Sequence, residues 1–157
     1  MLRRILFIFL TIICFCPFLY GYPKNIYLYK GKDKISVDTF LGKTTAIFFW
    51  AYWCEACKQE LLDLDKSEWQ NLNNIRFILV CLDKETMRES ESWAKKNLSF
   101  KLFDTLHFDP ELLFPEAVEL ESLPGHLIFD TKGNKIYAGK SDVKALIKFL
   151  EKSNLIK

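Results

Sequence analysis

The segment 46–60 reads AIFFWAYWCEACKQE and carries the strongest fold signal in the chain. It opens with a continuous apolar run, and such a run is typical of a strand that is buried on both faces of a sheet. Cys54 follows almost at once, and there a helical pattern begins, because Cys57, Leu61 and Leu64 fall on one face. The segment therefore predicts a buried strand that turns directly into an amphipathic helix, with two cysteines at the turn.

Further strands and helices are predicted on both sides of this unit. A second buried strand at 77–82 completes a strand–helix–strand unit with parallel strands. The remaining predicted elements are an edge strand at 26–29, a helix at 85–96, a short strand at 100–103, a partly helical connection around Pro110 and Pro115, a hairpin with strands at 127–129 and 136–138, and a closing amphipathic helix with Ser141 as its N-cap. This order predicts an α/β fold of three layers, a central mixed β-sheet flanked by helices on both faces.

The position of the two cysteines predicts their chemistry. Cys54 lies at the predicted helix N-terminus, where free N–H groups and the helix dipole favour an anion. The thiolate is the nucleophilic form of cysteine, so this position favours attack on a disulfide. Two intervening residues bring Cys57 within bonding reach. We therefore predict that Cys54 is exposed and attacks, and that Cys57, one turn deeper, resolves the mixed disulfide.

A CxxC pair also occurs in two other settings, as half of a zinc site and as an inert structural disulfide. A structural zinc site needs four ligands, and only Cys81, His107 and His126 remain outside the N-terminal segment to supply the others. Cys81 is expected to be a small core residue of the second strand, and His107 is expected at the surface. His126 could join Cys54 and Cys57 in a copper site, since thiolates favour Cu(I).

The N-terminal segment and the charge balance limit where the protein acts. Arg3 and Arg4 precede the apolar stretch 5–19, which is the pattern of a signal peptide. A spanning helix needs about 20 apolar residues, so residues 1–21 are interpreted as a signal peptide or N-terminal membrane anchor, followed by one domain at 22–157. The net charge is +2, from 22 basic and 20 acidic residues, and it gives no reason to expect nucleic acid as a partner.

The segment 48–60, FFWAYWCEACKQE, resembles the FWAxWCxxCxxE signature of the extracytoplasmic thioredoxin-like thiol–disulfide oxidoreductases, which include the membrane-tethered reductases of cytochrome c maturation. A second segment, LPGHLIFDTKG at 123–133, is similar to the cis-proline strand and turn of that family. The resemblance covers roughly Ile35 to Leu150 and implies the thioredoxin-like fold.

The resemblance also implies roles for individual residues. Pro124 would be cis and face the cysteines, and the backbone of Leu123 could then pair with an extended substrate segment. Glu60 matches the acidic residue near the buried sulfur, and a partly buried carboxylate can relay a proton to or from Cys57. The residues that flank Cys54 are expected to contribute too, Trp53 to the docking surface and Glu55 by opposing thiolate formation with its negative charge.

The expected function is dithiol–disulfide exchange on exported proteins, without a cofactor, and as a reductase rather than an oxidant. Apocytochrome c is one candidate substrate, a membrane donor would re-reduce the pair, and the protein is expected to be a monomer. An oxidant of exported thiols typically carries a large helical insertion, for which the chain has little room between Leu82 and Leu123. A copper chaperone that uses Cys54, Cys57 and His126, and a non-catalytic interaction module, are the alternatives from other classes.

Overall fold

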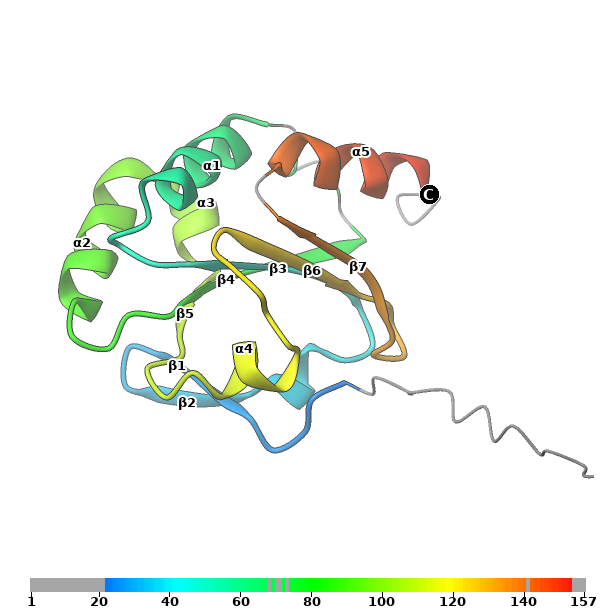
Figure 1. Cartoon of the computed structure of the whole chain (residues 1–157), viewed down its shortest axis with the longest axis horizontal. Helices are drawn as coiled ribbons and strands as arrows, with labels where there is room; N and C mark the ends of the chain where they lie inside the picture. The colour runs from blue at the N-terminus through cyan, green and yellow to red at the C-terminus, as the bar shows by residue number, and fades with distance from the viewer. Residues whose placement is uncertain (1–21, 68, 70–71, 73, 141, 154–157) are drawn as a thin grey trace, which may run out of the picture.

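The computed structural model describes residues 22–67, 69, 72, 74–140 and 142–153 (Figure 1). Residues 1–21, which we interpret as a signal peptide or anchor, lie outside the described residues. Among the helices that are described, none is long and apolar enough to cross a membrane.

The described strands form one mixed sheet in the order β2-β1-β5-β4-β3-β6-β7. The strands are β1 (Tyr27–Lys30), β2 (Asp33–Ser36), β3 (Thr44–Trp50), β4 (Ile75–Cys81), β5 (Leu106–Phe108), β6 (Gly125–Phe129) and β7 (Lys135–Lys140). Strands β3, β4 and β5 are parallel, while β6 pairs antiparallel with β3 and β7 with β6. The mixed sheet and the buried central strand confirm the predicted α/β class, since all seven residues of β3 are buried.

Helices cover both faces of the sheet (Figure 1). They are the 3-10 helix η1 (Val37–Phe40) and the α-helices α1 (Glu55–Lys66), α2 (Met87–Asn97), α3 (Phe100–Phe103), α4 (Leu113–Ala117) and α5 (Val143–Lys152). One core joins residues of α1, α2, α3 and α5 to one face of β3 and β4, and a second core joins α4, η1 and the N-terminal strands to the other face. The crossovers from β3 to β4 and from β4 to β5 run in the same direction, so a common right-handed turn places α1 and α2 on the same face.

Two predictions of local structure were wrong, one of a strand and one of a helix cap. The segment 100–103 forms helix α3 rather than a strand, because Ser99 caps it by accepting a hydrogen bond from the Leu102 N–H, and the strand follows as β5. Phe100 is 83% exposed, so its aromatic ring was a misleading signal for a strand. The N-cap of α5 is Asp142, whose carboxylate accepts from two backbone N–H groups; Ser141, predicted for this role, lies outside the described residues.

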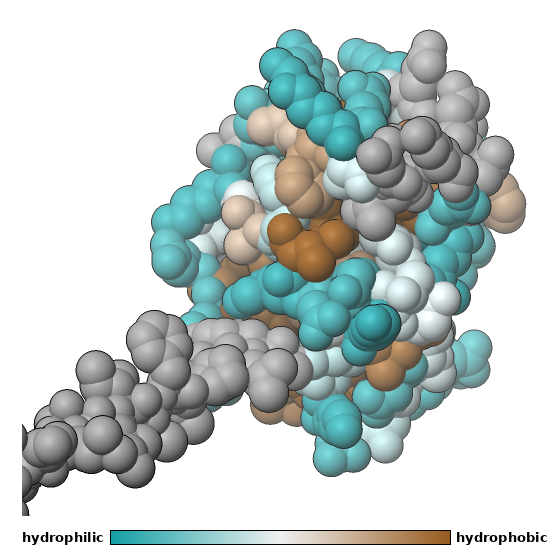
Figure 2. All heavy atoms as spheres, turned by 90° about the vertical axis from the view of Figure 1, so that its right-hand side faces the viewer, coloured by the Kyte–Doolittle hydropathy of each residue, from teal (hydrophilic) through white to brown (hydrophobic). Residues whose placement is uncertain are grey.

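Strand β7 is the edge of the sheet on the side of α5. Its residues alternate between half-buried and exposed, and it begins and ends with lysine. Figure 2 faces this side and shows a mainly hydrophilic surface around a compact hydrophobic area. Lysines on an edge strand oppose pairing with a second chain, because such pairing would bring charges together.

Candidate active site

The cysteine pair lies at the carboxyl end of β3, where the chain enters α1. Cys54 and Cys57 form a disulfide with a Cα–Cα distance of 5.2 Å. Cys54 is the N-cap of α1, and its Sγ accepts a hydrogen bond of 3.2 Å from the Cys57 N–H. After reduction, the free N–H groups and dipole of α1 would favour a thiolate at Cys54. The structure thus places Cys54 at the helix end that the sequence predicts.

The two sulfurs differ in depth. Cys54 is 8% exposed and Cys57 is 1% exposed, so the outer sulfur is the one that a partner can reach. Cys54 is more covered than we predicted, because its side chain turns back to cap the helix instead of pointing to solvent. The neighbouring Trp53 is 69% exposed and presents its ring at the surface.

The negative charge of Glu55 is balanced by a nearby lysine. Lys58 Nζ lies 2.5 Å from Glu55 Oε1 and 4.9 Å from the centre of the Tyr52 ring. The Lys58 side chain is largely covered, whereas the Glu55 side chain is exposed. Since the two charges are adjacent, Glu55 opposes thiolate formation at Cys54 less than its position in the sequence implies.

Glu60 and His126 meet behind the disulfide. Glu60 Oε2 lies 2.8 Å from His126 Nε2, and the two side chains are 15% and 1% exposed. Both residues line a narrow internal space together with Cys57 and Pro124. A proton-relay role for Glu60 is predicted from the sequence resemblance, but the pairing of Glu60 with His126 was not predicted. The two residues meet because β6 pairs antiparallel with β3 and sets His126 beside Phe48, close to the start of α1, and local sequence pattern gives no signal for this pairing.

Pro124 lies at the start of β6, and the Leu123–Pro124 peptide is cis. Leu123 is half-buried and packs against both cores. The loop before it approaches β6 closely, because a Cβ on Gly125 would lie 2.4 Å from Leu120 Cδ1 and 2.9 Å from the Ser122 carbonyl oxygen. Only glycine fits at this position without displacing the loop.

A buried carboxylate that was not predicted supports the loop before Cys54. Asp83 is 4% exposed, and its Oδ2 accepts a 2.5 Å hydrogen bond from the Tyr52 N–H and a 2.6 Å bond from Ser90 Oγ. Cys81 Sγ lies 3.4 Å from the same oxygen. Burial raises the pKa of the Cys81 thiol to about 12. The sequence signal was a lone aspartate directly after a buried strand, at the sheet edge where the cysteine pair also lies.

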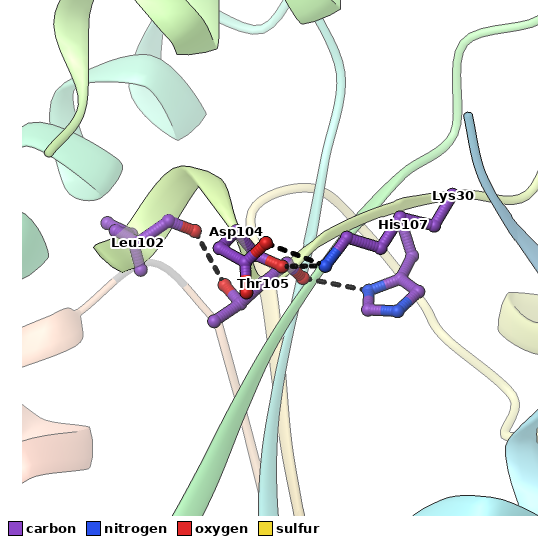
Figure 3. Close-up of polar contacts among 5 residues, drawn as sticks. All are labelled: Lys30, Leu102, Asp104, Thr105 and His107. Atoms are coloured by element: carbon purple, nitrogen blue, oxygen red, sulfur yellow. Dashed lines mark hydrogen bonds and ion pairs between the residues drawn. The ribbon is translucent and has the colours of Figure 1, made fainter. Parts of the chain in front are cut away.

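His107 is buried in β5, so its predicted position at the surface was wrong. Its ring Nδ1 lies 2.8 Å from the carbonyl oxygen of Thr105, and Lys30 pairs with Asp104 next to it (Figure 3). Burial lowers the pKa of His107. The ring also packs edge-on against Phe40. His107 therefore belongs to the packing of β5 and lies in a different strand from the cysteine pair.

The copper alternative finds no support in the arrangement of these side chains. Within the described part of the chain, no group of three or more His, Cys, Asp and Glu residues could hold a metal ion. The ring nitrogen of His126 that meets another group faces Glu60, and Cys54 and Cys57 are bonded to each other.

The chain matches one protein family and several solved structures. The model of the Redoxin family matches residues 23–152. Among solved structures, the chain superposes on a candidate thiol:disulfide interchange protein, DsbE, from Chlorobium tepidum, with a TM-score of 0.68, 20% identity and coverage of 86% of this chain and 93% of that one. A candidate protein disulfide isomerase from Bacteroides thetaiotaomicron gives a TM-score of 0.70 at 15% identity, covering 87% of each chain.

A third similar structure is the exposed lipoprotein thioredoxin Etrx1 of Streptococcus pneumoniae, with a TM-score of 0.63, 20% identity and coverage of 80% of this chain and 97% of that one. At sequence identities this low, the superpositions establish a common fold and nothing more specific. Among curated proteins, none is significantly similar in sequence. Because the Redoxin match spans most of the chain and a disulfide joins Cys54 to Cys57 at the start of α1, the chain belongs to the Redoxin family and is a thioredoxin-like thiol–disulfide oxidoreductase.

Proposed function

We propose that the protein is a reductase of disulfides in exported proteins. The observation that carries the proposal is the graded burial of the pair, with Cys54 at the helix N-terminus as the outer sulfur and Cys57 enclosed beside Glu60. The reduced Cys54 thiolate attacks a substrate disulfide, and Cys57 then attacks Cys54 and releases the substrate. Two electrons pass from the dithiol to the substrate, and the Cys54–Cys57 disulfide is left behind.

Glu60 takes the proton of Cys57 in this proposal. Cys57 must lose its proton before it attacks, because the thiolate is the nucleophile. Glu60 follows Cys57 by one turn of α1 and lines the same internal space, so we assign its carboxylate as the acceptor of this proton.

Substrate docking is assigned to the surface around Cys54. The exposed ring of Trp53 offers an apolar contact, and the backbone of Leu123, just before Pro124, offers hydrogen bonds to an extended segment. Glu55 lies at the edge of this surface with Lys58 beside it. Substrates would thus be held by backbone pairing and one large aromatic side chain, which suits exchange with several disulfide proteins.

The reducing direction is supported by the connection between β4 and β6. Its described residues form α2, the short helices α3 and α4 and strand β5, with no large helical insertion of the kind expected of an oxidant. In this proposal residues 1–21 export or anchor the domain outside the cytoplasm, and a membrane protein re-reduces the pair. The domain acts as a monomer, consistent with the lysines on the β7 edge, and apocytochrome c is one candidate substrate.

The reduction potential of the pair tests the direction. The chain would be equilibrated with a series of glutathione or dithiothreitol buffers, and the fraction of the Cys54–Cys57 disulfide would be measured at each potential. Known dithiol proteins run from about −270 mV for reductants to about −120 mV for strong oxidants. A value below roughly −220 mV supports a reductase, and a value above roughly −150 mV contradicts it and makes the protein an oxidant of exported thiols.

A further inference from the structure

His126 makes a close polar contact with Glu60, the proposed proton acceptor. It lies in β6, two residues after Pro124, and reaches across to α1, where its Nε2 is 2.8 Å from Glu60 Oε2. Its side chain is almost completely buried. Neither its Nδ1 nor Glu60 Oε2 has a hydrogen-bond partner, so Nε2 and Oε2 make a close polar contact that is not aligned as a hydrogen bond. The imidazole packs against Phe48, with ring centres 4.7 Å apart. The polar contact of the ring is therefore directed at Glu60.

The other groups around this contact come from α1, β3 and β7. Cys57 and Glu60 come from α1, and the neighbours from β3 are uncharged, namely Phe48, Phe49 and Trp50. On β7, Gly139 pairs with His126, and a Cβ on Gly139 would lie 2.4 Å from the Tyr137 hydroxyl, so this phenol lies over the same part of the sheet. Burial raises the pKa of Tyr137, and the charges of Asp142 and Glu60 raise it further.

Two effects act in opposite directions on the protonation of a carboxylate in this position. Burial favours the protonated form of a carboxyl group, and a protonated Glu60 could not accept the proton of Cys57. A hydrogen-bond donor directed at the carboxylate favours the ionised form instead. His126 can supply such a donor, because its Nε2 lies 2.8 Å from Glu60 Oε2.

We propose that His126 is a positioning residue that, after a small rotation of its ring, donates from Nε2–H to the Glu60 carboxylate and keeps it in the proton-accepting form beside Cys57. The inference rests on the proposed role of Glu60 and adds a second residue to it. A proton on Nε2 leaves the unpartnered Nδ1 as a bare lone pair, which costs less when buried than an unpartnered N–H. The His126 ring thus selects the Nε2–H tautomer.

His126 supports the step in which Cys57 attacks the mixed disulfide between Cys54 and the substrate. The S–H bond of Cys57 breaks, and its proton passes to Glu60. The sulfur's electron pair forms the S–S bond to Cys54 as the bond between Cys54 and the substrate sulfur breaks. The substrate leaves as a thiolate with that electron pair, and it takes up a proton from solvent or from Glu60.

The pH profile of Cys57 attack tests the proposal. Reduced full-length chain would be mixed with Ellman's reagent, and release of the second nitrothiobenzoate reports attack of Cys57 on the mixed disulfide at Cys54. Subtracting the trace of Cys57→Ser removes the signal of the other cysteines. In His126→Leu we expect the acid limb of the profile to move up by about one pH unit, which is about tenfold slower attack at a fixed pH on that limb.

Two matched variants separate this effect from a loss of packing. His126→Gln retains an N–H donor and should bring the profile back toward that of the unmutated chain. His107→Leu removes the other buried histidine, which lies in β5, and should leave the profile unchanged. An unshifted profile in His126→Leu, or an equal shift in His126→Gln and His126→Leu, would overturn the proposal.

Replacing Glu60 distinguishes a failure of this inference from a failure of the proposed function. Glu60→Gln should abolish the acid limb and slow Cys57 attack by roughly 10²-fold, the lower end of general-base effects. Adding His126→Leu to Glu60→Gln should change nothing further. If Glu60→Gln has no effect, the role of Glu60 is wrong; if it has its effect and His126→Leu alone has none, only the role of His126 is wrong.

The tautomer can be read without any substitution. Nitrogen-15 NMR of histidine-labelled protein at about pH 8 should give a protonated Nε2 and an unprotonated Nδ1 for His126. The opposite tautomer would overturn the proposal, even if His126→Leu failed to fold.

Discussion

The carboxyl end of β3 and the adjacent strands β4 and β5 hold the same reactive residue types in opposite conditions. The first region has Cys54 and Cys57 at a helix N-terminus, with His126 facing a carboxylate. The second has Cys81 within β4 and His107 within β5. Burial raises the pKa of Cys81 to about 12 and lowers that of His107, so both stay neutral near pH 7. The reactivity of a cysteine or histidine in this protein therefore depends less on its residue type than on its burial and on the groups that contact it.

The two regions are joined by Asp83. Cys81 pairs with Trp50 across β3 and β4, so Asp83, two residues later, reaches the level of the active-site loop. Asp83 then accepts from the Tyr52 N–H and from Ser90. The inert region thus positions the reactive one, and the comparison can be tested from both sides.

The largest expected effect comes from removing the outer sulfur. Cys54→Ser should lower the rate of reduction of a disulfide-bonded model protein by roughly 10⁴-fold or more, as loss of a nucleophile does in other enzymes. Cys81→Ala should leave that rate unchanged, because Cys81 lies inside the sheet. A comparable loss in both variants would remove the distinction between the two regions.

Removing the carboxylate that joins the regions should come next. Asp83→Ala should lower the free energy of unfolding by about 2 kcal/mol, because the partly buried Tyr52 N–H loses its acceptor and the Ser90 hydroxyl keeps only the Thr86 carbonyl oxygen. Urea denaturation measures this value. Ser90→Ala, which removes only one of the bonds, should cost about 1 kcal/mol. Equal losses in the two variants would contradict a special role for Asp83.

Thiol labelling should separate the cysteines of the two regions. With a pKa of about 12, the Cys81 thiol is ionised in roughly one molecule in 10⁴ at about pH 8. In the folded, reduced chain, iodoacetamide should therefore modify Cys54 well before Cys81, as peptide mass spectrometry would show. In urea both should react at similar rates. Early modification of Cys81 in the folded protein would show that burial does not protect it.

The smallest expected effect is a pH dependence of stability that arises from His107. Its folded-state pKa is lowered by burial, so at pH values just below 6.5 the unfolded chain binds the proton more tightly than the folded chain does. Stability should fall as the pH decreases through 6.5 toward the folded pKa. In His107→Gln this fall should be smaller than in the unmutated chain, measured as Tm at several pH values. An identical fall in both would assign the acid sensitivity to other groups.

Much of the fold followed from local pattern. The apolar run of β3, the cysteine pair and the spacing of Leu61 and Leu64 on α1 predicted a strand, a turn and a helix that the structure contains. These signals are strong because full burial demands continuous apolar sequence and helix periodicity repeats over several turns. The segment 100–103 was harder, because four residues with two phenylalanines suit a short strand or a short helix, and the Ser99 cap decided between them.

The residues that could react were evident from local sequence pattern, because a CxxC pair lies between a buried strand and the helical spacing of Cys57, Leu61 and Leu64. Tertiary structure decided which partners those residues have. His126 and Glu60 are far apart in the chain, and they meet only because β6 pairs antiparallel with β3 beside α1. His107 and Cys81 became inert for the same reason, since burial and partners depend on strand order, which local periodicity does not encode.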